Sequence, residues 1–573
     1  MNPRPSPFQR FVFFTPLAAC LILTATLFAQ STNRQIGTQL TATADPLVPR
    51  PDGRPCVVQL FNNFQFAHFS DSAQTFAFTP PAACPGPWEK VVFEIDFSEN
   101  AGVQFDRTAS LYLANTNIYF GTTPEPLANV TNSWHVERDI TDYSALLSAP
   151  QQGTIILANC TTDCPPPFNT RLNGVFTVNA GLQFYPAERE HHKRDDHRDH
   201  RVPDQVLPLE QVNSSGGINL PATLQPTDQL ATTFTLPTNT EHVYLDVVSQ
   251  SQSVDEQWYA CFPNDLSSIN LVYGCGNTDF RESEITIDGQ PAGIAPVSPW
   301  VFTGFLPDQW VPAPAAQTLD FVPYRVNLTP FAALLSNGQP HTIALSVFNN
   351  DGFFSATASL LLFLDSGTKQ ITGALTKNTL TNPSPVVTEN LQGTETVTGT
   401  INVTSSRKYD IAGFVNTSHG KVSTSISQHQ NFSGTQTIDF DTVNATVLDQ
   451  LTQVQTSLSS KTTISNEEGA FVVRDDFSFP ITVDFIFPVP AAQFGFTVAT
   501  TQNYRTKKQT SVDGFVLQST SVSNSVNATD VSPASSSQRY TVSGGDDASY
   551  NCRVASAKNV LTAVSHGCND DEK

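Results

Sequence analysis

Short runs in which polar and apolar residues alternate recur along most of the chain, and Pro and Gly separate them. Alternation with a period of two is the pattern of a strand that has one face in a core and the other in solvent. The chain also holds 40 Phe, 40 Pro and one Met among 573 residues. This composition favours pleated strands joined by turns over long amphipathic helices. The sequence therefore predicts an all-β protein of roughly two to four domains.

The charge balance excludes one class of partner. The chain carries 30 basic and 52 acidic residues, which gives a formal net charge of −22. Nucleic acid is bound mainly by clusters of Lys and Arg that neutralise phosphates. We therefore expect no nucleic-acid partner.

Residues 1–29 have the pattern of a secretory signal, because Arg4 and Arg10 precede the apolar run 11–28. We expect a secreted or extracytoplasmic protein, periplasmic if the source is a Gram-negative bacterium, with no stable membrane span once the signal is removed. An uncleaved N-terminal anchor is one alternative. Lipid attachment at Cys20 is another, although the apolar run continues beyond that cysteine where a polar tether would normally begin.

The cysteine count also favours export. Without Cys20 an even number remains, and even numbers in an exported chain indicate disulfides. The eight candidates are Cys56, Cys84, Cys160, Cys164, Cys261, Cys275, Cys552 and Cys568. Pairing of neighbours in sequence is the simplest of many connectivities. Zinc is the competing interpretation, but no second Cys or His pair lies close in sequence to the short Cys160–Cys164 spacing, so we predict no metal.

Shifts in composition divide the chain into six parts. These are a signal (1–29), a flexible tether (30–54), a first β-sandwich (55–188), a charged inter-domain loop (189–206), a second β-sandwich (207–365) and a C-terminal β domain (366–573). The loop contains REHHKRDDHRDHR, whose four histidines suggest metal binding. No apolar residue interrupts this run, so a solvated linker is the favoured interpretation.

Two patterns in the second sandwich carry structural expectations. HTIALSVFNNDG and SATASLLLFLD have the alternation of paired strands, and FRESEITIDG predicts a strand closed by an Asp-Gly turn. If Ile285 and Ile287 face the core, Arg281 shares their face and Glu282 points out of it. A buried Arg needs a carboxylate partner, so Arg281 is either a structural tie or a site residue near the interface between domains.

The stretch from Gln104 to Tyr143 concentrates ionisable groups in a chain that has only 14% charged residues. Residues 104–113 alternate as a half-buried strand would, which places Asp106 at one strand end and away from the core. Arg107 follows it directly. These residues form a candidate site.

Four separated motifs together resemble the acidic, plant-type peptide:N-glycosidase A family. They are QFDRTASLYLANTNIYFGTTPEP, WHVERDITDYSALL, GNTDFRESEITIDG and Trp310-Val311-Pro312 followed by NGQPHTIALSVFNN, and the similarity covers about residues 54 to 365. The same two units are similar, more distantly, to the bacterial F-type peptide:N-glycosidase. That second resemblance implies two adjacent jelly-roll-like β-sandwiches.

The F-type resemblance also assigns candidate residues. Its key aspartate lies in an Asp-Arg strand motif that matches Asp106-Arg107, and its Phe-Arg pair matches Phe280-Arg281. The match is incomplete, because Asn159 and Gly276-Asn277 stand where the F-type enzyme has glutamates.

What the resemblance implies is hydrolysis of the amide that joins the first N-acetylglucosamine to an Asn side chain, with no cofactor. The substrates are N-glycopeptides or N-glycoproteins, and Asn becomes Asp. Asp106 is the candidate base, Arg107 or Arg281 the oxyanion donor, and Glu282 the candidate acid ahead of Glu137 and Glu125. The candidate substrate contacts are Arg281, Asn159, Asn277, Glu137, Trp258, Trp300 and Trp310.

Two other classes of protein fit parts of the pattern. A carbohydrate-binding or adhesion protein built from β-sandwiches needs no pair of carboxylates facing one cleft. A glycoside hydrolase needs a pair at a set separation. A second carboxylate facing one cleft with Asp106 would favour the amidase over the binder. We expect it from Phe280 to Glu284, so the site should lie where the two sandwiches meet.

Overall fold

The computed structural model describes residues 35–164, 172–187, 201–266, 275–301, 311–441, 443, 446–486, 497–529, 532–544 and 549–568. Antiparallel strands dominate these residues, and the helices are single turns. The predicted all-β fold is therefore confirmed. The charged run REHHKRDDHRDHR and Trp310 lie largely outside the described residues.

The first unit is a sandwich of two four-stranded sheets. One sheet has the order β1 (Cys56–Phe66), β8 (Phe176–Pro186), β3 (Trp88–Glu99) and β6 (Asn132–Asp139), and the other has the order β2 (Ala73–Phe78), β7 (Gln151–Leu157), β4 (Thr108–Leu113) and β5 (Thr116–Thr122). The connections add η1 (Phe69–Asp71), η2 (Thr141–Tyr143) and α1 (Ser144–Leu147). Aromatic and branched side chains from both sheets fill the space between them.

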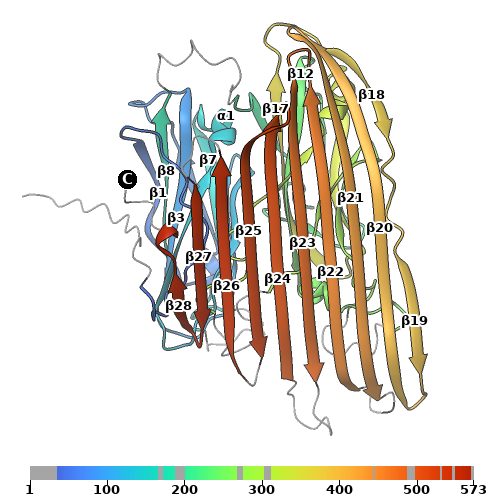
Figure 1. Ribbon diagram of the computed structural model, residues 1–573. Coiled ribbons are helices and arrows are strands. Elements are labelled where there is room, and N and C mark those ends of the chain that lie inside the picture. The colour runs from blue at the N-terminus through green and yellow to red at the C-terminus, as the bar shows by residue number, and fades with distance from the viewer. Residues whose placement is uncertain are drawn as a thin grey trace, which may run out of the picture.

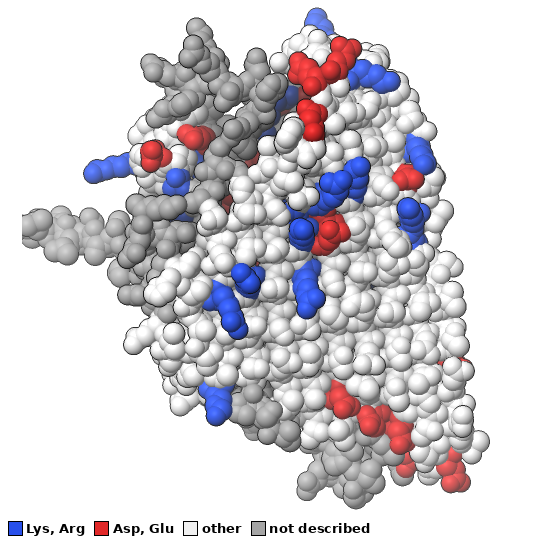
Figure 2. Space-filling model, in the orientation of Figure 1, with Lys and Arg blue, Asp and Glu red and all other residues white. Residues whose placement is uncertain are grey.

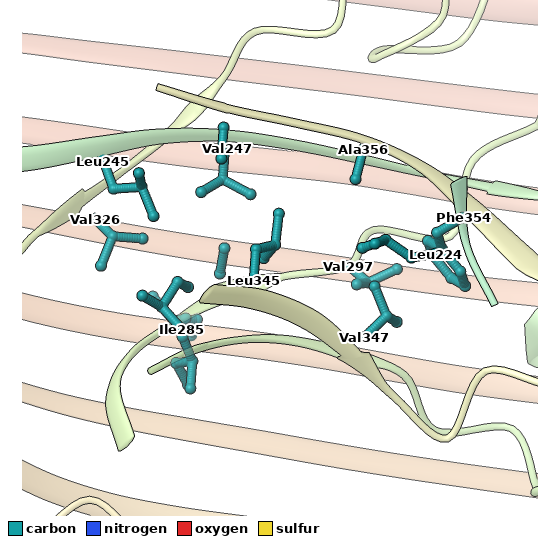
Figure 3. Close-up of a cluster of buried hydrophobic side chains, with 14 of the residues drawn as sticks. Leu224, Leu245, Val247, Ile285, Val297, Val326, Leu345, Val347, Phe354 and Ala356 are labelled. Atoms are coloured by element: carbon teal, nitrogen blue, oxygen red, sulfur yellow. The ribbon is translucent and has the colours of Figure 1, made fainter. Parts of the chain in front are cut away.

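The second unit is another two-sheet sandwich. One sheet has the order β10 (Ala222–Leu224), β17 (Phe353–Leu364), β12 (Thr240–Gln252) and β15 (Tyr324–Asn327), with β9 (Gln205–Pro208) also paired to β17, and the other has the order β11 (Leu230–Phe234), β16 (His341–Phe348), β13 (Glu282–Ile287) and β14 (Gln290–Pro296). Short helices are η4 (Ser253–Asp255), η5 (Trp258–Ala260), η7 (Thr329–Phe331) and α2 (Ala332–Leu335). Figure 3 shows Leu245, Val326, Ile285 and Leu345 meeting between these sheets.

The predicted turn after β13 is confirmed, because Asp288 and Gly289 have φ values of 50° and 77° and join β13 to β14. The predicted pairing of β16 with β17 is wrong. β16 pairs with β11 and β13, whereas β17 pairs with β12, β10 and β9. The chain crosses from one sheet to the other at residues 349–352, and alternation alone carries no signal for that crossing.

The C-terminal region forms one antiparallel sheet of 11 strands, which makes a broad layer at the front of Figure 1. Its strands are β18 (Thr372–Asn378), β19 (Val386–Gln392), β20 (Thr396–Thr417), β21 (Gly420–Asp441), β22 (Thr446–Ser465), β23 (Ala470–Ile486), β24 (Thr497–Val512), β25 (Phe515–Thr529), β26 (Ser532–Gly544), β27 (Tyr550–Ala557) and β28 (Val560–Val564), followed by η8 (His566–Cys568). Strands β20 to β26 have 13 to 22 residues. This length accounts for the scarcity of turn signals in that part of the sequence.

One face of this sheet packs on the second sandwich, and the two share a single apolar core. Buried glutamines on the same face donate hydrogen bonds to loop carbonyls of the second unit: Gln436 to Cys261 at 2.7 Å and Gln450 to Ala260 at 3.1 Å. The fit is close at Gly413, where an added Cβ would lie 2.1 Å from the carbonyl oxygen of Pro330. The sheet is thus joined to the sandwich by specific polar contacts as well as by apolar burial.

The opposite face of the sheet is exposed. Figure 2 shows this face largely without charge, with Lys and Arg side chains gathered mainly over its middle and acidic ones toward its ends. The interspersed charges discourage edge and face association of a large sheet.

The two sandwiches meet along β4, β5 and β12. Tyr143 Oη donates to Asp246 at 2.8 Å, and Thr108 Oγ1 donates to Gln250 Oε1 at 3.0 Å. β4 was predicted to be half-buried, but Ser110 and Tyr112 on its polar face are 0% and 1% exposed. The prediction is wrong because the second unit covers the face that would otherwise meet solvent.

The predicted tether is fixed over residues 41–50. Ala44 N donates to Gln538 on the C-terminal sheet at 3.0 Å, and Thr41 N donates to Asn132 of the first sandwich at 3.2 Å. Arg50 forms ion pairs with Glu137 at 2.6 Å and with Glu94. This segment therefore bridges the first sandwich and the C-terminal sheet.

All eight predicted cysteines form disulfides, and each pairs with its neighbour in sequence. The bonds are Cys56–Cys84, Cys160–Cys164, Cys261–Cys275 and Cys552–Cys568. Within the part of the chain that the structure describes, no helix has the length and apolar character needed to cross a membrane.

Candidate active site

Asp106 lies in the segment that leads into β4, beside the second sandwich. β4 begins at Thr108, so the strand predicted from Gln104 is too long at its start. Two hydrogen bonds fix the backbone here: Arg107 N donates to Thr123 Oγ1 at 2.8 Å, and Thr123 N donates to Arg107 O at 2.8 Å. The loop after β5 therefore holds Asp106 and Arg107 in place.

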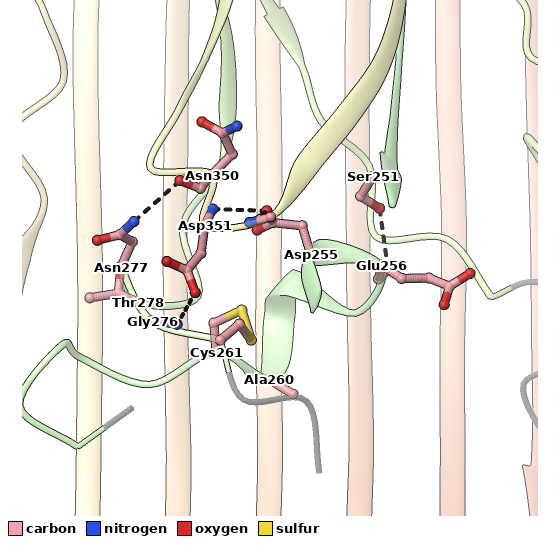
Figure 4. Close-up of a disulfide and its surroundings, with 12 residues drawn as sticks. Ser251, Asp255, Glu256, Ala260, Cys261, Gly276, Asn277, Thr278, Asn350 and Asp351 are labelled. Atoms are coloured by element: carbon pink, nitrogen blue, oxygen red, sulfur yellow. Dashed lines mark hydrogen bonds between the residues drawn. A yellow bond between two sulfur atoms is a disulfide. The ribbon is translucent and has the colours of Figure 1, made fainter. Parts of the chain in front are cut away.

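The second sandwich supplies Glu256 to the same place. β12 ends at Gln252, and Ser253 takes a left-handed conformation with φ of 58° that turns the chain into η4. Glu256 follows, and its carbonyl accepts a hydrogen bond from Ser251 Oγ at 3.2 Å. Figure 4 shows the Glu256 carboxylate directed away from Asp255 and the disulfide.

Asp255 and Arg281 anchor the turn that presents Glu256. Arg281 Nε donates to Asp255 Oδ1 at 2.8 Å, and both side chains are 0% exposed. The other guanidinium nitrogens donate to carbonyls such as that of Thr278 at 2.7 Å. Asp255 Oδ2 also accepts the amides of Asp351 and Gly352 at 2.8 and 2.5 Å, at the crossing between sheets. Arg281 is therefore a structural tie, and the prediction that it contacts substrate is wrong because no part of it is accessible.

Removal of this tie should cost the protein stability. Arg281→Met leaves the Asp255 carboxylate buried without its cation, a change that typically destabilises by about 3–5 kcal/mol. We expect a matching fall in the free energy of unfolding in urea. Arg474→Met, on the exposed face of the C-terminal sheet, is the control and should change it little. Equal stability of the two variants would contradict the structural role of Arg281.

Asp106 and Glu256 both have raised pKa values, and the charge of Asp106 acts on Glu256. Burial raises the pKa of Asp106 to about 6, an effect that the charge of Arg107 opposes. Burial also raises the pKa of Glu256 to about 7, and the negative charge of Asp106 adds to that rise. The junction thus holds two carboxyl groups, one from each sandwich, whose pKa values are both raised.

Arg107 lies among carboxylates. Burial lowers its pKa, while Asp106, Glu125 and Glu99 all oppose that change. Glu99, at the end of β3, has a pKa raised to about 8 by burial and by the charge of Glu125. The guanidinium carbon of Arg107 lies 5.2 Å from the centre of the Phe105 ring. Arg107 is therefore the cation of this junction, and Glu125 is the one reserve candidate acid placed beside it.

Glu282, the leading candidate acid from sequence, is not brought to Asp106. Its carboxylate pairs with Arg407 of β20 and is 0% exposed. Glu282 points out of the sandwich core, as its place in the alternation of β13 predicts. That outward face, however, is covered by the C-terminal sheet, so the assignment of Glu282 as the acid is corrected.

Glu137 is likewise engaged elsewhere. Its two oxygens accept hydrogen bonds from Arg50 at 2.6 and 2.8 Å and from Val48 N at 2.7 Å, and one contacts His135 at 3.0 Å. These partners lower the pKa of Glu137 to about 2 against the effect of burial, which would raise it. It fastens the N-terminal segment to β6, and the predicted substrate contact is not supported.

The remaining predicted contacts are structural. Trp258 and Trp300 are 0% and 2% exposed, so their faces are not available to a sugar. Asn159 Nδ2 donates to Phe66 O at 2.7 Å, and Asn277 exchanges hydrogen bonds with Asn264 at 2.8 and 2.9 Å. Of the candidates predicted from sequence and described by the structure, Asp106 and Arg107 stay together at the junction.

One possible metal group lies at the hairpin between β20 and β21. Glu241, Asp365 and His419 place ligand atoms within 4.8 Å of one another. Arg201 already pairs with Glu241, and Ser418 Oγ donates to Asp365 at 2.6 Å. Arg201 balances the charge of Glu241 and Ser418 satisfies Asp365 by a hydrogen bond, so the group is explained by its contacts within the protein.

Sequence reasoning missed Glu256. The available signal was the acidic pair Asp255-Glu256 directly after the alternating run that became β12, followed by Gln257-Trp258. Two adjacent carboxylates at a strand end are a common turn feature. Their separate roles, one buried on Arg281 and the other facing Asp106, depend on the contact between units.

Each of the two sandwiches presents one titrating carboxylate at the junction, and Arg107 lies beside Asp106. Such an all-β protein has the groups that hydrolysis by acid–base catalysis requires. The particular family follows from the sequence. The chain belongs to the peptide N-acetyl-beta-D-glucosaminyl asparaginase amidase A family, whose model matches residues 46–377. The resemblance inferred from the motifs is thereby confirmed.

Known proteins similar to this chain include enzymes of plant and bacterial origin. Peptide-N4-(N-acetyl-beta-glucosaminyl)asparagine amidase A of Prunus dulcis is 28% identical over 408 residues, which are 68% of each chain. PNGase F, a glycosylasparaginase from Flavobacterium meningosepticum, is 16% identical with a TM-score of 0.36 and covers 55% of this chain and 97% of its own. The structure of PNGF-II has 14% identity and a TM-score of 0.36, over 54% and 65% of the two chains.

Proposed function

We propose that this protein hydrolyses the amide between an Asn side chain and the first N-acetylglucosamine of an N-glycan. The products are the intact glycan, released as a glycosylamine, and a peptide in which Asn has become Asp. Family membership supports the reaction class. The observation that carries the assignment of residues is that Asp106 and Glu256 come from different sandwiches and lie close enough for the charge of Asp106 to raise the pKa of Glu256.

The three groups have complementary roles in the proposed reaction. The Asp106 carboxylate takes a proton from water, whose oxygen attacks the amide carbonyl carbon. Arg107 stabilises the negative charge that develops on the carbonyl oxygen. Protonated Glu256 then gives its proton to the amide nitrogen as the C–N bond breaks, so the leaving group departs as a neutral amine. Two carboxyl groups with separated pKa values are suited to divide the roles of base and acid in this way.

This division predicts a bell-shaped pH dependence. Asp106 must be ionised, so kcat/KM should fall as the pH drops below about 6, the pKa of that group. Glu256 must be protonated, so kcat/KM should also fall as the pH rises above about 7. Because the groups interact, the two limbs report apparent values of the pair. Initial rates on a short N-glycopeptide from pH 4 to 9 measure the profile, and a rate that still rises above pH 8 would contradict it.

We further propose that the protein acts outside the cytoplasm on N-glycopeptides or N-glycoproteins. The apolar N-terminal run and the four disulfides support export, because structural disulfides persist in oxidising compartments.

The direct test is the mass of the peptide product. The purified full chain is incubated with a short N-glycopeptide, and the peptide is analysed by mass spectrometry. A deglycosylated peptide with Asp in place of Asn is the expected product. A peptide that retains one N-acetylglucosamine would indicate an endoglycosidase, and an unchanged glycopeptide that still binds would indicate a carbohydrate-binding protein.

A further inference from the structure

A cavity of about 420 Å³ lies between the second sandwich and the inner face of the C-terminal sheet. Small-molecule sites commonly have volumes of about 300–1,000 Å³. The residues described above as the candidate active site do not line it. It is therefore a separate feature, and it exists only because the C-terminal sheet covers the sandwich.

The wall formed by the sheet combines aromatic rings with hydroxyl groups. Alternate residues of β23, β24 and β26 point inward here, which brings Phe477, Tyr504, Thr506 and Tyr540 to the cavity. Phe477 and Tyr540 are half-buried, so parts of these rings remain accessible from the cavity. Such rings offer broad apolar faces, and the phenol adds a polar group at one edge.

The wall formed by the sandwich repeats this combination. Tyr324 packs against Phe477 with ring centres 5.5 Å apart, and Gln317 Nε2 donates to the Tyr504 hydroxyl at 3.2 Å. Among the described residues, none forms a hydrogen bond with the side chains of Tyr324, Thr506 or Tyr540. These three hydroxyls are available to a ligand.

The charges that line the cavity are of both signs, with three acidic residues and four basic ones: Asp45, Asp320 and Asp475, and Arg325, Lys507, Lys508 and Arg539. Lys508 stands opposite Asp475 in the register of β24 and β23, and its charge opposes the rise that burial causes in the pKa of Asp475. Arg325 is held by Asp246 at 2.7 Å and by Asp142 at 2.6 Å. A site for phosphate or sulfate would instead present uncompensated cations.

We propose that this cavity binds a neutral oligosaccharide, namely the sugars of an N-glycan that lie beyond the amide. Sugars present apolar ring faces and many hydroxyl groups without charge, which matches half-exposed aromatic rings, available hydroxyls and a lining without an excess of one sign beyond a single charge. The identification of the ligand as an N-glycan rests on the proposed function. The cavity thereby gives the C-terminal sheet a role in substrate recognition.

A short chain of contacts joins this cavity to the candidate active site. Trp300 lines the cavity and donates from Nε1 to Ser251 Oγ at 3.0 Å. Ser251 Oγ in turn donates to the carbonyl of Glu256 at 3.2 Å. The wall of the cavity and the backbone of the proposed acid are thus supported by the same residue.

The test is calorimetric titration of the full chain with a free neutral N-glycan that lacks sialic acid. Val522→Trp fills the cavity from β25, whereas Ser523→Trp places the same side chain on the opposite, exposed face. We expect wild type and Ser523→Trp to bind alike and Val522→Trp to bind at least tenfold more weakly. Tyr540→Phe removes one available hydroxyl with little change of shape and should weaken binding about three- to tenfold. The Tyr540→Phe variant still tests the proposal if Val522→Trp does not fold.

Two results would overturn the proposal: no binding by wild type, or equal binding by wild type, Val522→Trp and Tyr540→Phe. Turnover of a glycopeptide bearing a single N-acetylglucosamine is measured in parallel, because such a substrate lacks the sugars that the cavity would hold. Ser523→Trp, on the exposed face, should leave that turnover unchanged. Glycan binding without any turnover would contradict the proposed amidase function and leave the cavity assignment intact, so the two can be judged separately.

Discussion

Asp106→Asn is expected to lower kcat and kcat/KM together by about 10²- to 10⁴-fold. The substitution keeps the shape of the side chain but removes the group that takes the proton from water. Because the loss falls on the transition state, KM for the glycopeptide should change little. Initial rates of peptide release, followed by mass spectrometry at the pH optimum, measure the effect.

The fold of this variant should survive. Burial raises the pKa of Asp106 to about 6 in the folded protein, above about 3.9 for an exposed Asp. Folding therefore favours the protonated form, and the ionised carboxylate makes the folded state less stable as the pH rises from about 4 to 6. An Asn lacks this penalty, so the melting temperature at pH 7 should equal or exceed that of wild type. Retained turnover in a folded Asp106→Asn protein would remove Asp106 from the mechanism.

Glu256→Gln should produce the second large loss, again about 10²- to 10⁴-fold in kcat. Gln cannot give a proton to the leaving amine. The alkaline limb of the pH profile should also disappear, because the group that deprotonates near pH 7 is gone. The acid limb should remain near pH 6, because burial, and not the charge of Glu256, raises the pKa of Asp106.

Glu282→Gln is the matched control, since it makes the same chemical change at the carboxylate that sequence analysis favoured. Glu282 faces Arg407 of the C-terminal sheet, so kcat should stay within about threefold of wild type. Its unfolding free energy should fall, because Arg407 loses a charged partner. A large loss of kcat in Glu282→Gln with none in Glu256→Gln would reverse the assignment of the acid.

Local sequence patterns predicted where strands lie, but they did not predict which strand faces are exposed to solvent. The runs at 57–61, 75–78, 91–97 and 153–157 all fall within strands of the first sandwich. The environment of each face depends on contacts between units, which a single strand does not encode. The polar face of β4 is buried for this reason, and the outward side of Glu282 meets a sheet contributed by residues more than 100 positions away.

The dependence on contacts between units also explains why only part of the candidate site could be predicted from the sequence. The Asp-Arg pair at 106–107 was found because it stands out locally beside an alternating run. Its partner Glu256 was missed because Asp255, in the same local setting, looks alike in sequence although it is buried against Arg281 and two backbone amides. Only the approach of the two sandwiches distinguishes the carboxylate that supports the fold from the one that faces Asp106.

The claim that Asp106 and Glu256 act as one site is tested most directly by combining their substitutions. Residues that act as a unit in one chemical step give grossly non-additive losses. We predict that kcat of Asp106→Asn/Glu256→Gln on an N-glycopeptide, scored by the appearance of peptide with Asp in place of Asn, will match the more impaired single variant within about tenfold. Losses that multiply in the double variant would show that the two carboxylates act independently and would contradict the account.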